Sequence, residues 1–278
     1  MNRLIELLTT DNESELIPSA LYNELITSVR DNLVGTQVLA RRVGPEGIPG
    51  STLTVALNTR NAMLCEEIAE GAEFPKSRAK AESFDITPKK YGLDIQITRE
   101  MIEDSRFNDV VWQVEEAGYQ MAKKLDTLIM AQIEAGDTAA SHTVTGAAAI
   151  TVANISTAIK NLRTDGYNAD YMIVSAAVED DLHNIDTFHE ADKVGNRETF
   201  ERGLVGRIMG MTVLVSTQVT ANYSYVIDSR HAVILVEKRP ISIENYKLEN
   251  NDLVGIAVSA RWGVRYLRAE ANCVITTT

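Results

Sequence analysis

The sequence predicts an α+β fold, and three observations indicate it. Segments that alternate apolar and polar residues, as strands do, occur before and after helical segments without a strict strand–helix–strand order. One apolar stripe at helical spacing runs from about Asn108 to Ala135. A connection of 26 residues, Asn58 to Ser83, separates two strand-like segments. Compact domains rarely carry so long a connection unless it has a function.

Residues 1–50 are predicted to form an arm. Apolar residues recur at helical spacing over about Pro18 to Leu33, where Pro18 suits a first turn and Gly35 suits the end. The following segment, residues 41–50, is dense in Gly and Pro and predicts an irregular extended chain.

Three strands are predicted next, at residues 52–57, 84–87 and 93–98, because apolar residues alternate there. The long connection between the first two either folds back locally or projects and packs on a neighbour. Nine of its residues are charged: Arg60, Glu66, Glu67, Glu70, Glu73, Lys76, Arg78, Lys80 and Glu82.

The long stripe predicts a helix with Asn108 as its N-cap and Gly136 as its end. At ~1.5 Å per residue this helix is around 40 Å long, well above the globular average, so it is expected to act as a structural spine.

The remainder is predicted to mix helices and strands. Residues 135–152 and 184–205 are expected to be loops, and Asn154–Arg163 a helix that ends at Asp165-Gly166. Ser175 is expected to cap a short helix after a strand at 171–174. Further strands are predicted at Val213–Ser216, Tyr225–Ile227, Ala232–Val236, Ile241–Tyr246, Val254–Ala260 and Val264–Ile275.

Composition excludes several classes of protein. The net charge is −12 and no basic stripe is evident, which argues against a protein that grips nucleic acid through a dedicated basic surface. Cys65 and Cys273 lie far apart and predict buried, plain thiols in a reducing cytoplasm. The start lacks the apolar core of a signal peptide, and no apolar run approaches the ~20 residues of a membrane span.

No catalytic, cofactor or metal motif is convincing. Nucleotide-binding loops and the G-x-S-x-G nucleophile motif are absent. His183 and His189 lie among Asp186, Glu190 and Asp192, but their separation of six suits neither one helical face nor an H-E-x-x-H pair, so a solvated loop is preferred.

Two further patterns have structural interpretations. The Glu179-Asp180-Asp181 run is expected in the first turns of a helix, where carboxylates favour the positive end of the dipole. Gly206 and Gly210 are expected to mark a turn before the strand at Val213–Ser216.

Several segments, taken in order over roughly 220 residues, resemble the HK97-type major capsid proteins of tailed phages and related viruses. The most specific are Glu70-Gly71 with Pro75, Phe84 to Lys90, and Ile97 to Ser105. Ala122 to Asp126 resembles the family's Ala-x-x-x-Asp near the end of the long helix, and Gly206 to Ser216 its Gly…Gly-x-Pro-Val…Ser. Thr212 replaces that Pro, and the segment from Arg261 to Val274 lacks the family's Pro and Phe.

The resemblance implies an HK97-like capsid fold with an N-terminal arm, an extended β-hairpin called the E-loop, a P domain with a long spine helix, and an A domain. These correspond to residues 1–50, 51–92, 93–145 and 146–236. The P domain is expected to be completed by about 237–263 and the A domain by about 264–278.

The implied function is a structural, non-enzymatic one. Hexamers and pentamers of the chain would build an icosahedral shell in the virion, assembled in the host cytoplasm around double-stranded DNA that is enclosed without sequence-specific binding. The resemblance implies scaffolding, portal and decoration proteins as partners, and it implies no association with a membrane. The residues expected at contacts between subunits are Arg41, Arg42, Glu70, Glu73, Phe74, Lys76, Arg78 and Lys80.

Some members of that family join an E-loop Lys covalently to a neighbour's Asn, and Lys76 and Lys80 are the loop lysines here. Many members also carry a cleaved scaffolding segment, and the short stretch before the E-loop suggests a separate scaffolding protein or none. Two alternatives remain open: an encapsulin, which is a cellular compartment of the same fold that encloses a cargo enzyme, and an α+β enzyme that uses the cluster from His183 to Asp192.

Overall fold

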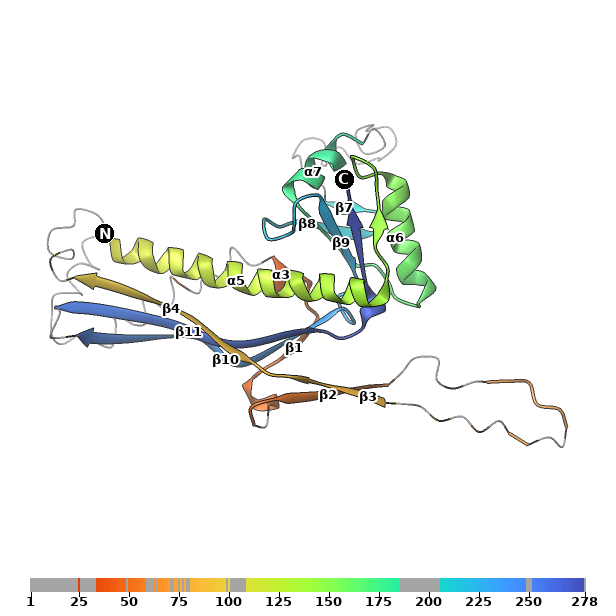
Figure 1. Cartoon of the computed structure of the whole chain (residues 1–278), viewed down its shortest axis with the longest axis horizontal. Coiled ribbons are helices and arrows are strands. Elements are labelled where there is room, and N and C mark those ends of the chain that lie inside the picture. The colour runs from red at the N-terminus through yellow and green to blue at the C-terminus, as the bar shows by residue number, and fades with distance from the viewer. Residues whose placement is uncertain are drawn as a thin grey trace.

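The computed structural model describes residue 25 and residues 34–48, 50–58, 63, 65–70, 73–74, 76, 78, 81–98, 100, 109–185, 206–248 and 252–277. The molecule is elongated (Figure 1). A long helix lies along a four-stranded sheet and reaches a six-stranded sheet at its C-terminal end. A two-stranded hairpin lies on the side of the four-stranded sheet that faces away from the long helix.

Helix α5, Asp109–Ala140, is the predicted spine. Its 32 residues make it ~48 Å long at ~1.5 Å per residue. The predicted stripe is buried at Val114, Met121, Ile129 and Ile133, which confirms the helical period.

The predicted end of α5 at Gly136 is wrong, because the helix continues to Ala140. A Cβ on Gly136 would overlap the side-chain amide nitrogen of Asn272, which is fully buried. The glycine therefore permits close packing of the helix against a strand and does not end the helix.

The four-stranded sheet has the order β1-β10-β11-β4, with β1 at Arg41–Val43, β4 at Lys89–Thr98, β10 at Val233–Leu248 and β11 at Leu253–Tyr266. Strand β1 runs parallel to β10, and the other two pairs are antiparallel. The arm segment at 41–43 is therefore a strand and was wrongly predicted to be irregular.

Two pairs of predicted strands have different boundaries in the structure. The segments at 232–236 and 241–246 form the single strand β10, which carries a register irregularity around Pro240. Irregular pairing accommodates a proline that cannot donate to the ladder, so the strand continues through it. The segments at 254–260 and 264–275 divide instead after Tyr266, and the chain then enters the other sheet.

The six-stranded sheet has the order β5-β12-β9-β6-β8-β7. Its strands are β5 Val144–Thr145, β6 Tyr171–Val174, β7 Arg207–Ile208, β8 Met211–Val215, β9 Tyr223–Ile227 and β12 Asn272–Thr276. Helix α6, Val152–Thr164, is capped by Thr151, and helix α7, Ala176–His183, is capped by Ser175 as predicted.

Helices α5 and α6 cover opposite faces of this sheet. Tyr225 on β9 bonds Glu134 of α5, whereas the Cys273 thiol on β12 lies beside Asn161 of α6. Tyr225 pairs with Val274, the residue after Cys273, and successive side chains on a strand alternate between faces. The spine therefore supports the side of the six-stranded sheet that α6 leaves open.

The hairpin consists of β2, Leu53–Asn58, and β3, Ala81–Ile86, paired antiparallel. Its inner face packs on a second, smaller core, which is separate from the main one. The buried members of this core are Ile48, Ile86, Ile234, Val236 and Leu267. The predicted strands at 52–57 and 84–87 are confirmed within one to three residues.

The arm is described in part. Leu25 is helical and fully buried, while the rest of the predicted helix from Pro18 to Leu33 lies outside the described residues. Helix α3, Gly35–Val38, precedes β1, and a 3-10 turn, Pro45–Gly47, follows it. Most of the predicted loop at 184–205 also lies outside the described residues.

The role assigned to Gly136 predicts an inverted substitution effect. Alanine normally stabilises a helix interior by about 1 kcal/mol relative to glycine. Gly136→Ala is instead expected to lower the free energy of unfolding by about 1–3 kcal/mol, because the new methyl group displaces the buried Asn272 amide. Urea unfolding measures this change in the free energy of unfolding. Gly44→Ala, which has open space around the new Cβ, is the control, and equal stability of both variants would contradict the packing role.

Candidate assembly surfaces

Most of the predicted contact residues lie in the β2–β3 loop, which comprises residues 59–80. Glu70, Glu73, Lys76 and Arg78 are exposed, and the Phe74 side chain has 80% of its surface exposed. Lys80 lies outside the described residues. Met63 is also 60% exposed. Large apolar side chains held in solvent on a charged loop are typical of a surface that another molecule covers.

The base of this loop is fastened to the body. Arg268 donates a hydrogen bond from Nη2 to the carbonyl oxygen of Asn58 at 2.6 Å. The Arg265 guanidinium lies 5.1 Å from the centre of the Phe84 ring, within the range of a cation–π contact. With the small core beneath the hairpin, these contacts fix the direction in which the loop leaves the molecule.

A polar hollow of about 480 Å³ lies at the same base, between the hairpin, the turn at 164–167 and residues 265–270. Both Arg265 and Arg268 line it, together with the acidic residues Glu82 and Glu270. The charged residues that line the hollow come from three parts of the chain. No nucleophile–base pair is found among the lining residues, so the hollow does not resemble a catalytic site.

The other predicted contact residues, Arg41 and Arg42, are exposed on the edge strand β1. Their side chains differ in hydrogen bonding. Arg42 donates from its guanidinium to the carbonyl oxygen of Thr36, so it is tied to its own arm. Within the described part of the chain the Arg41 side chain has no such partner, which leaves it available to another molecule.

Asp126 joins the arm to the spine helix. Its buried carboxylate accepts hydrogen bonds from the backbone N–H groups of Val34 and Gly35, both at 3.0 Å. These donors lie at the start of α3, where backbone N–H groups lack helical partners. Gly35 has no space for a side chain, because a Cβ would lie 2.9 Å from Asp126 Oδ1 and 3.0 Å from Ile129. Burial raises the pKa of Asp126, and the two hydrogen bonds oppose that shift.

Asp137 joins the end of the spine helix to the six-stranded sheet. Its carboxylate accepts from Val274 N at 2.8 Å and from Thr143 Oγ1 at 2.6 Å, and its side chain is buried. Burial raises the pKa of Asp137 above its ordinary value of 3.8, and the hydrogen bonds from Thr143 and Val274 partly oppose the shift.

Two neighbouring contacts strengthen this joint. Tyr225 donates its hydroxyl to Glu134, and burial together with that carboxylate raises the pKa of Tyr225. His142 places Nε2 2.9 Å from Asp165 Oδ2, at the end of α6. The spine helix, β9, β12 and α6 therefore meet in one polar cluster.

The thiols differ from each other. Cys273 is buried as predicted and donates to the carbonyl oxygen of His142 at 2.9 Å, and burial raises its pKa to about 12. Cys65 is exposed, contrary to prediction, because it lies on the projecting loop and has no core to enter. Neither forms a disulfide.

Catalytic chemistry finds little support in the part of the chain that the structure describes. No group of three His, Cys, Asp or Glu side chains there could hold a metal ion. His231 pairs with the buried Asp228 at 3.1 Å, a structural contact. His183 is half-buried at the end of α7, whereas His189 and its acidic neighbours lie outside the described residues. No helix among the described residues is long and apolar enough to cross a membrane.

Sequence reasoning missed the two aspartate joints, although a signal was present. Asp126 lies four residues after the buried Ala122, and Asp137 lies four residues after the buried Ile133. A carboxylate at that spacing points toward the same side as the apolar stripe, where it needs buried donors.

This architecture, a hairpin loop fixed at its base beside a spine helix and two sheets, is the HK97-type fold of viral shell proteins. The sequence profile of the phage capsid protein family matches residues 81–275. The chain therefore belongs to the phage capsid protein family and is a structural capsid protein. No match is found among curated protein sequences.

Solved structures share the fold at low sequence identity. The capsid of cyanophage P-SCSP1u has a TM-score of 0.72 at 13% identity, covering 88% of each chain. A structure from Mycobacterium phage Che8 has a TM-score of 0.69 at 13% identity, covering 87% of this chain and 90% of that one. A virus-like particle from Pyrococcus furiosus has a TM-score of 0.61 at 16% identity, covering 92% and 98%.

The arm joint is tested by removing its acceptor. Asp126→Ala leaves the Val34 and Gly35 N–H groups without partners, and the free energy of unfolding is expected to fall by about 1–3 kcal/mol. Amide hydrogen exchange at those two residues should accelerate as well. Lys123→Ala, at an exposed position of the same helix, is the control. Unchanged exchange in the Asp126 variant would contradict the joint.

The second joint predicts a pH effect of defined sign. Because the pKa of Asp137 is higher in the native state than in the unfolded state, protonation of Asp137 favours the native state. This stabilisation is fully present below about pH 3.8 and is lost as the pH rises through the native pKa. Asp137→Asn has no such titration. The stability of the wild type relative to the Asn variant should therefore decline from acidic pH toward neutrality, measured by urea unfolding across that range. A difference independent of pH would refute the assignment.

Proposed function

We propose that the chain assembles as hexamers and pentamers into an icosahedral shell that encloses double-stranded DNA. The observation that carries the proposal is the β2–β3 loop, in which Phe74 is 80% exposed beyond a base fixed by Arg265 and Arg268. A fixed base with an uncovered apolar tip suits a loop that reaches over a neighbouring copy.

The parts of the chain take the following roles in this proposal. Residues 1–50 are the arm and 51–92 the E-loop. Residues 93–145, completed by about 237–263, are the peripheral P domain, and 146–236, completed by about 264–278, the axial A domain. The two separate sheets and the spine helix that joins them support this division.

The energetics favour collective assembly. Covering one exposed aromatic or aliphatic side chain contributes about 1.5–3 kcal/mol. Such a contact is weak between two copies, but each copy makes several at once, and their free energies add in a closed shell. Exposed Glu70, Glu73, Lys76, Arg78 and Arg41 would then set the register between neighbours through charge.

Enclosure of the genome requires no sequence reading. The chain carries a net charge of −12, so its inner wall need not hold the packaged DNA through phosphate contacts. Assembly in the host cytoplasm with scaffolding, portal and decoration proteins fits this role, with the virion as the final location.

A second candidate function is an encapsulin shell around a cargo enzyme. Its support is the likeness to the Pyrococcus furiosus particle, whose TM-score of 0.61 is below the 0.72 of the cyanophage capsid. Particles purified from producing cells and treated with nuclease distinguish the two. Nuclease-protected double-stranded DNA supports the capsid function, and protein cargo without nucleic acid supports the encapsulin.

Removal of the aromatic tip tests the loop. Phe74→Ser is expected to raise the subunit concentration required for shell formation at least tenfold, since it loses about 2 kcal/mol of apolar burial per contact. Phe74→Leu keeps an apolar side chain and should change it much less. Light scattering and electron microscopy measure assembly. Normal shells from the Ser variant would refute the role of the loop tip.

A further inference from the structure

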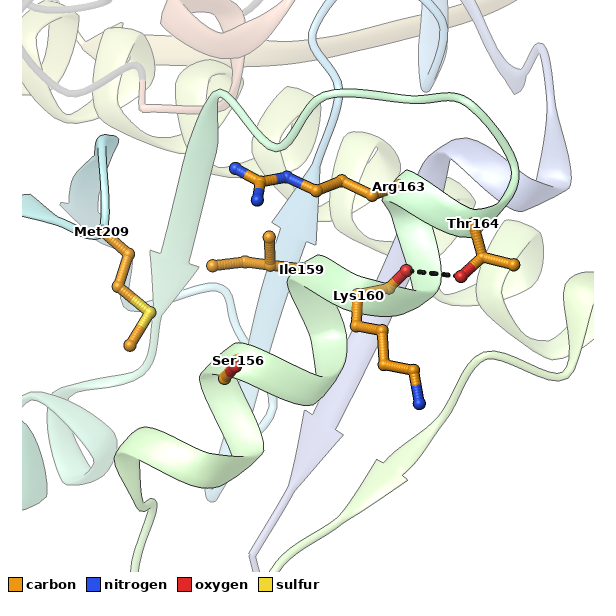
Figure 2. Close-up of a pocket in the computed structure, with 6 residues that line it drawn as sticks. All are labelled: Ser156, Ile159, Lys160, Arg163, Thr164 and Met209. Carbon is orange, nitrogen blue, oxygen red and sulfur yellow. Dashed lines mark hydrogen bonds between the residues drawn. The ribbon is translucent and has the colours of Figure 1, made fainter.

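A second uncovered surface lies on the six-stranded sheet, far along the chain from the loop. It is a hollow of about 580 Å³ between α6 and the turn that joins β7 to β8. Figure 2 shows Ile159 and Arg163 of α6 directed toward Met209 of that turn, across the space between them. Ile159, which is 7% exposed, and Met209 supply an apolar floor and wall. Lys160 and Arg163 are exposed and also line the hollow, and Figure 2 shows the Lys160 side chain directed away from Met209.

The turn that carries Met209 is unusual. Arg207 pairs with Thr212 and Ile208 with Met211, so only Met209 and Gly210 remain between the strands. Their φ angles of 49° and 90° define the hairpin turn in which both central residues have positive φ. Asn-Gly is favoured there, and a bulky side chain at positive φ is strained.

Folding alone gives no reason for methionine at this position. Its side chain remains 46% exposed, so it adds little to the core, and its backbone conformation is one that asparagine or glycine adopts at lower cost. Strain retained at an exposed apolar residue points to a contact outside the chain.

The charges beside it are also unused. Neither Lys160 nor Arg163 forms an ion pair within the part of the chain that the structure describes. Two cations that lack an ion pair among the described residues, beside a hollow lined by both apolar and polar side chains, favour an acidic partner with small apolar side chains.

We infer that this hollow receives helix α7 of a neighbouring copy of the chain. The outward side of α7 carries Ala176 and Ala177, both exposed, followed by Glu179 and the exposed Asp180. Alanines can approach Met209 and Ile159 closely, while the two carboxylates match Lys160 and Arg163 in number and sign.

The positions of the two surfaces suit a ring. In Figure 1, α6 lies on the right of the six-stranded sheet and α7 on its upper left. Two different patches on one domain make a head-to-tail contact, which closes into a ring when each copy is rotated from the last by a fixed angle. The inference rests on the proposed assembly into hexamers and pentamers and names one surface that holds these rings together.

Nucleic acid is the alternative ligand for this hollow, because Lys160 and Arg163 could also bind phosphate groups. An exposed methionine in a strained turn adds nothing to the binding of phosphate, so the apolar part of the hollow favours a protein partner. The experiment therefore measures nucleic-acid binding as a separate outcome.

Charge exchange between the two surfaces tests the inference. K160E/R163E and E179K/D180K are each expected to reduce the yield of shells at least tenfold, because each places like charges across the contact. The variant that combines all four substitutions restores opposite charges and the wild-type net charge, and its yield should return to within about threefold of wild type. K123E/R230E, which reverses two exposed cations outside the hollow, is the matched control and should assemble normally.

Met209→Asn separates contact from folding. Asparagine suits the positive φ angle, so the thermal stability of the unassembled subunit should stay equal or rise, while the yield of shells falls at least threefold. A structural role for Met209 alone would lower stability and assembly together, and that result would overturn its assignment to the contact.

The outcomes are distinct. Failure of the four-substitution variant to assemble, under conditions in which the wild type forms shells, overturns the inference and leaves the proposed function intact. Normal shells from K160E/R163E, with a loss of binding to a double-stranded DNA oligonucleotide, would assign the hollow to phosphate and also overturn it. Failure of the wild type itself to form any shell would instead count against the proposed function.

Discussion

The structure depends on two buried carboxylates on one helix. Asp126 holds the arm against the spine through the Val34 and Gly35 N–H groups, and Asp137 holds the six-stranded sheet through Val274 and Thr143. Each carboxylate leaves water, which raises its pKa, and each is compensated by directional hydrogen bonds from elements distant in sequence. Apolar packing alone could hold the same elements near the helix, but it would fix their positions less sharply.

The spine helix therefore fixes the two sheets relative to each other. Its flank packs on the four-stranded sheet, and its C-terminal end meets β9, β12 and α6 in the cluster around Asp137 and His142. Gly136 lets the helix and Asn272 approach closely at the same place. Close packing and buried hydrogen bonds together make this joint resistant to bending.

The outer surfaces follow a different principle. Phe74 on the loop and Met209 on the β7–β8 turn are large apolar side chains that the isolated chain leaves in water. The Arg265 and Arg268 contacts hold the base of the loop that carries Phe74, and a tight hairpin carries Met209. Rigid presentation reduces the entropy lost on contact, so a small apolar area can contribute to assembly.

The sequence by itself determined the elements whose signals are local. The stripe from Val114 to Ile133 predicted the spine, and Ser175 predicted the start of α7 correctly, since helical period and caps depend on near neighbours. The long charged loop between β2 and β3 was also evident from the sequence. The resemblance to HK97-type capsid proteins supplied the larger arrangement, which periodicity could not.

Only the tertiary structure decided what depends on distant partners. Gly136 has the local signature of a helix end, yet it continues the helix because Asn272 packs against it. Strand β1 pairs with β10, which lies about 190 residues further along the chain, so the segment at 41–43 is extended although its Gly- and Pro-rich surroundings predicted an irregular chain. The spacing of Asp126 and Asp137 after buried residues of the stripe indicates buried carboxylates, but their partners, such as the Gly35 and Val274 N–H groups, are 91 and 137 residues away. The role of Met209 comes from a positive φ angle that its residue type does not indicate. The distant partners and the backbone angle exist only once the chain has folded, so a local pattern can indicate burial but cannot name the partner.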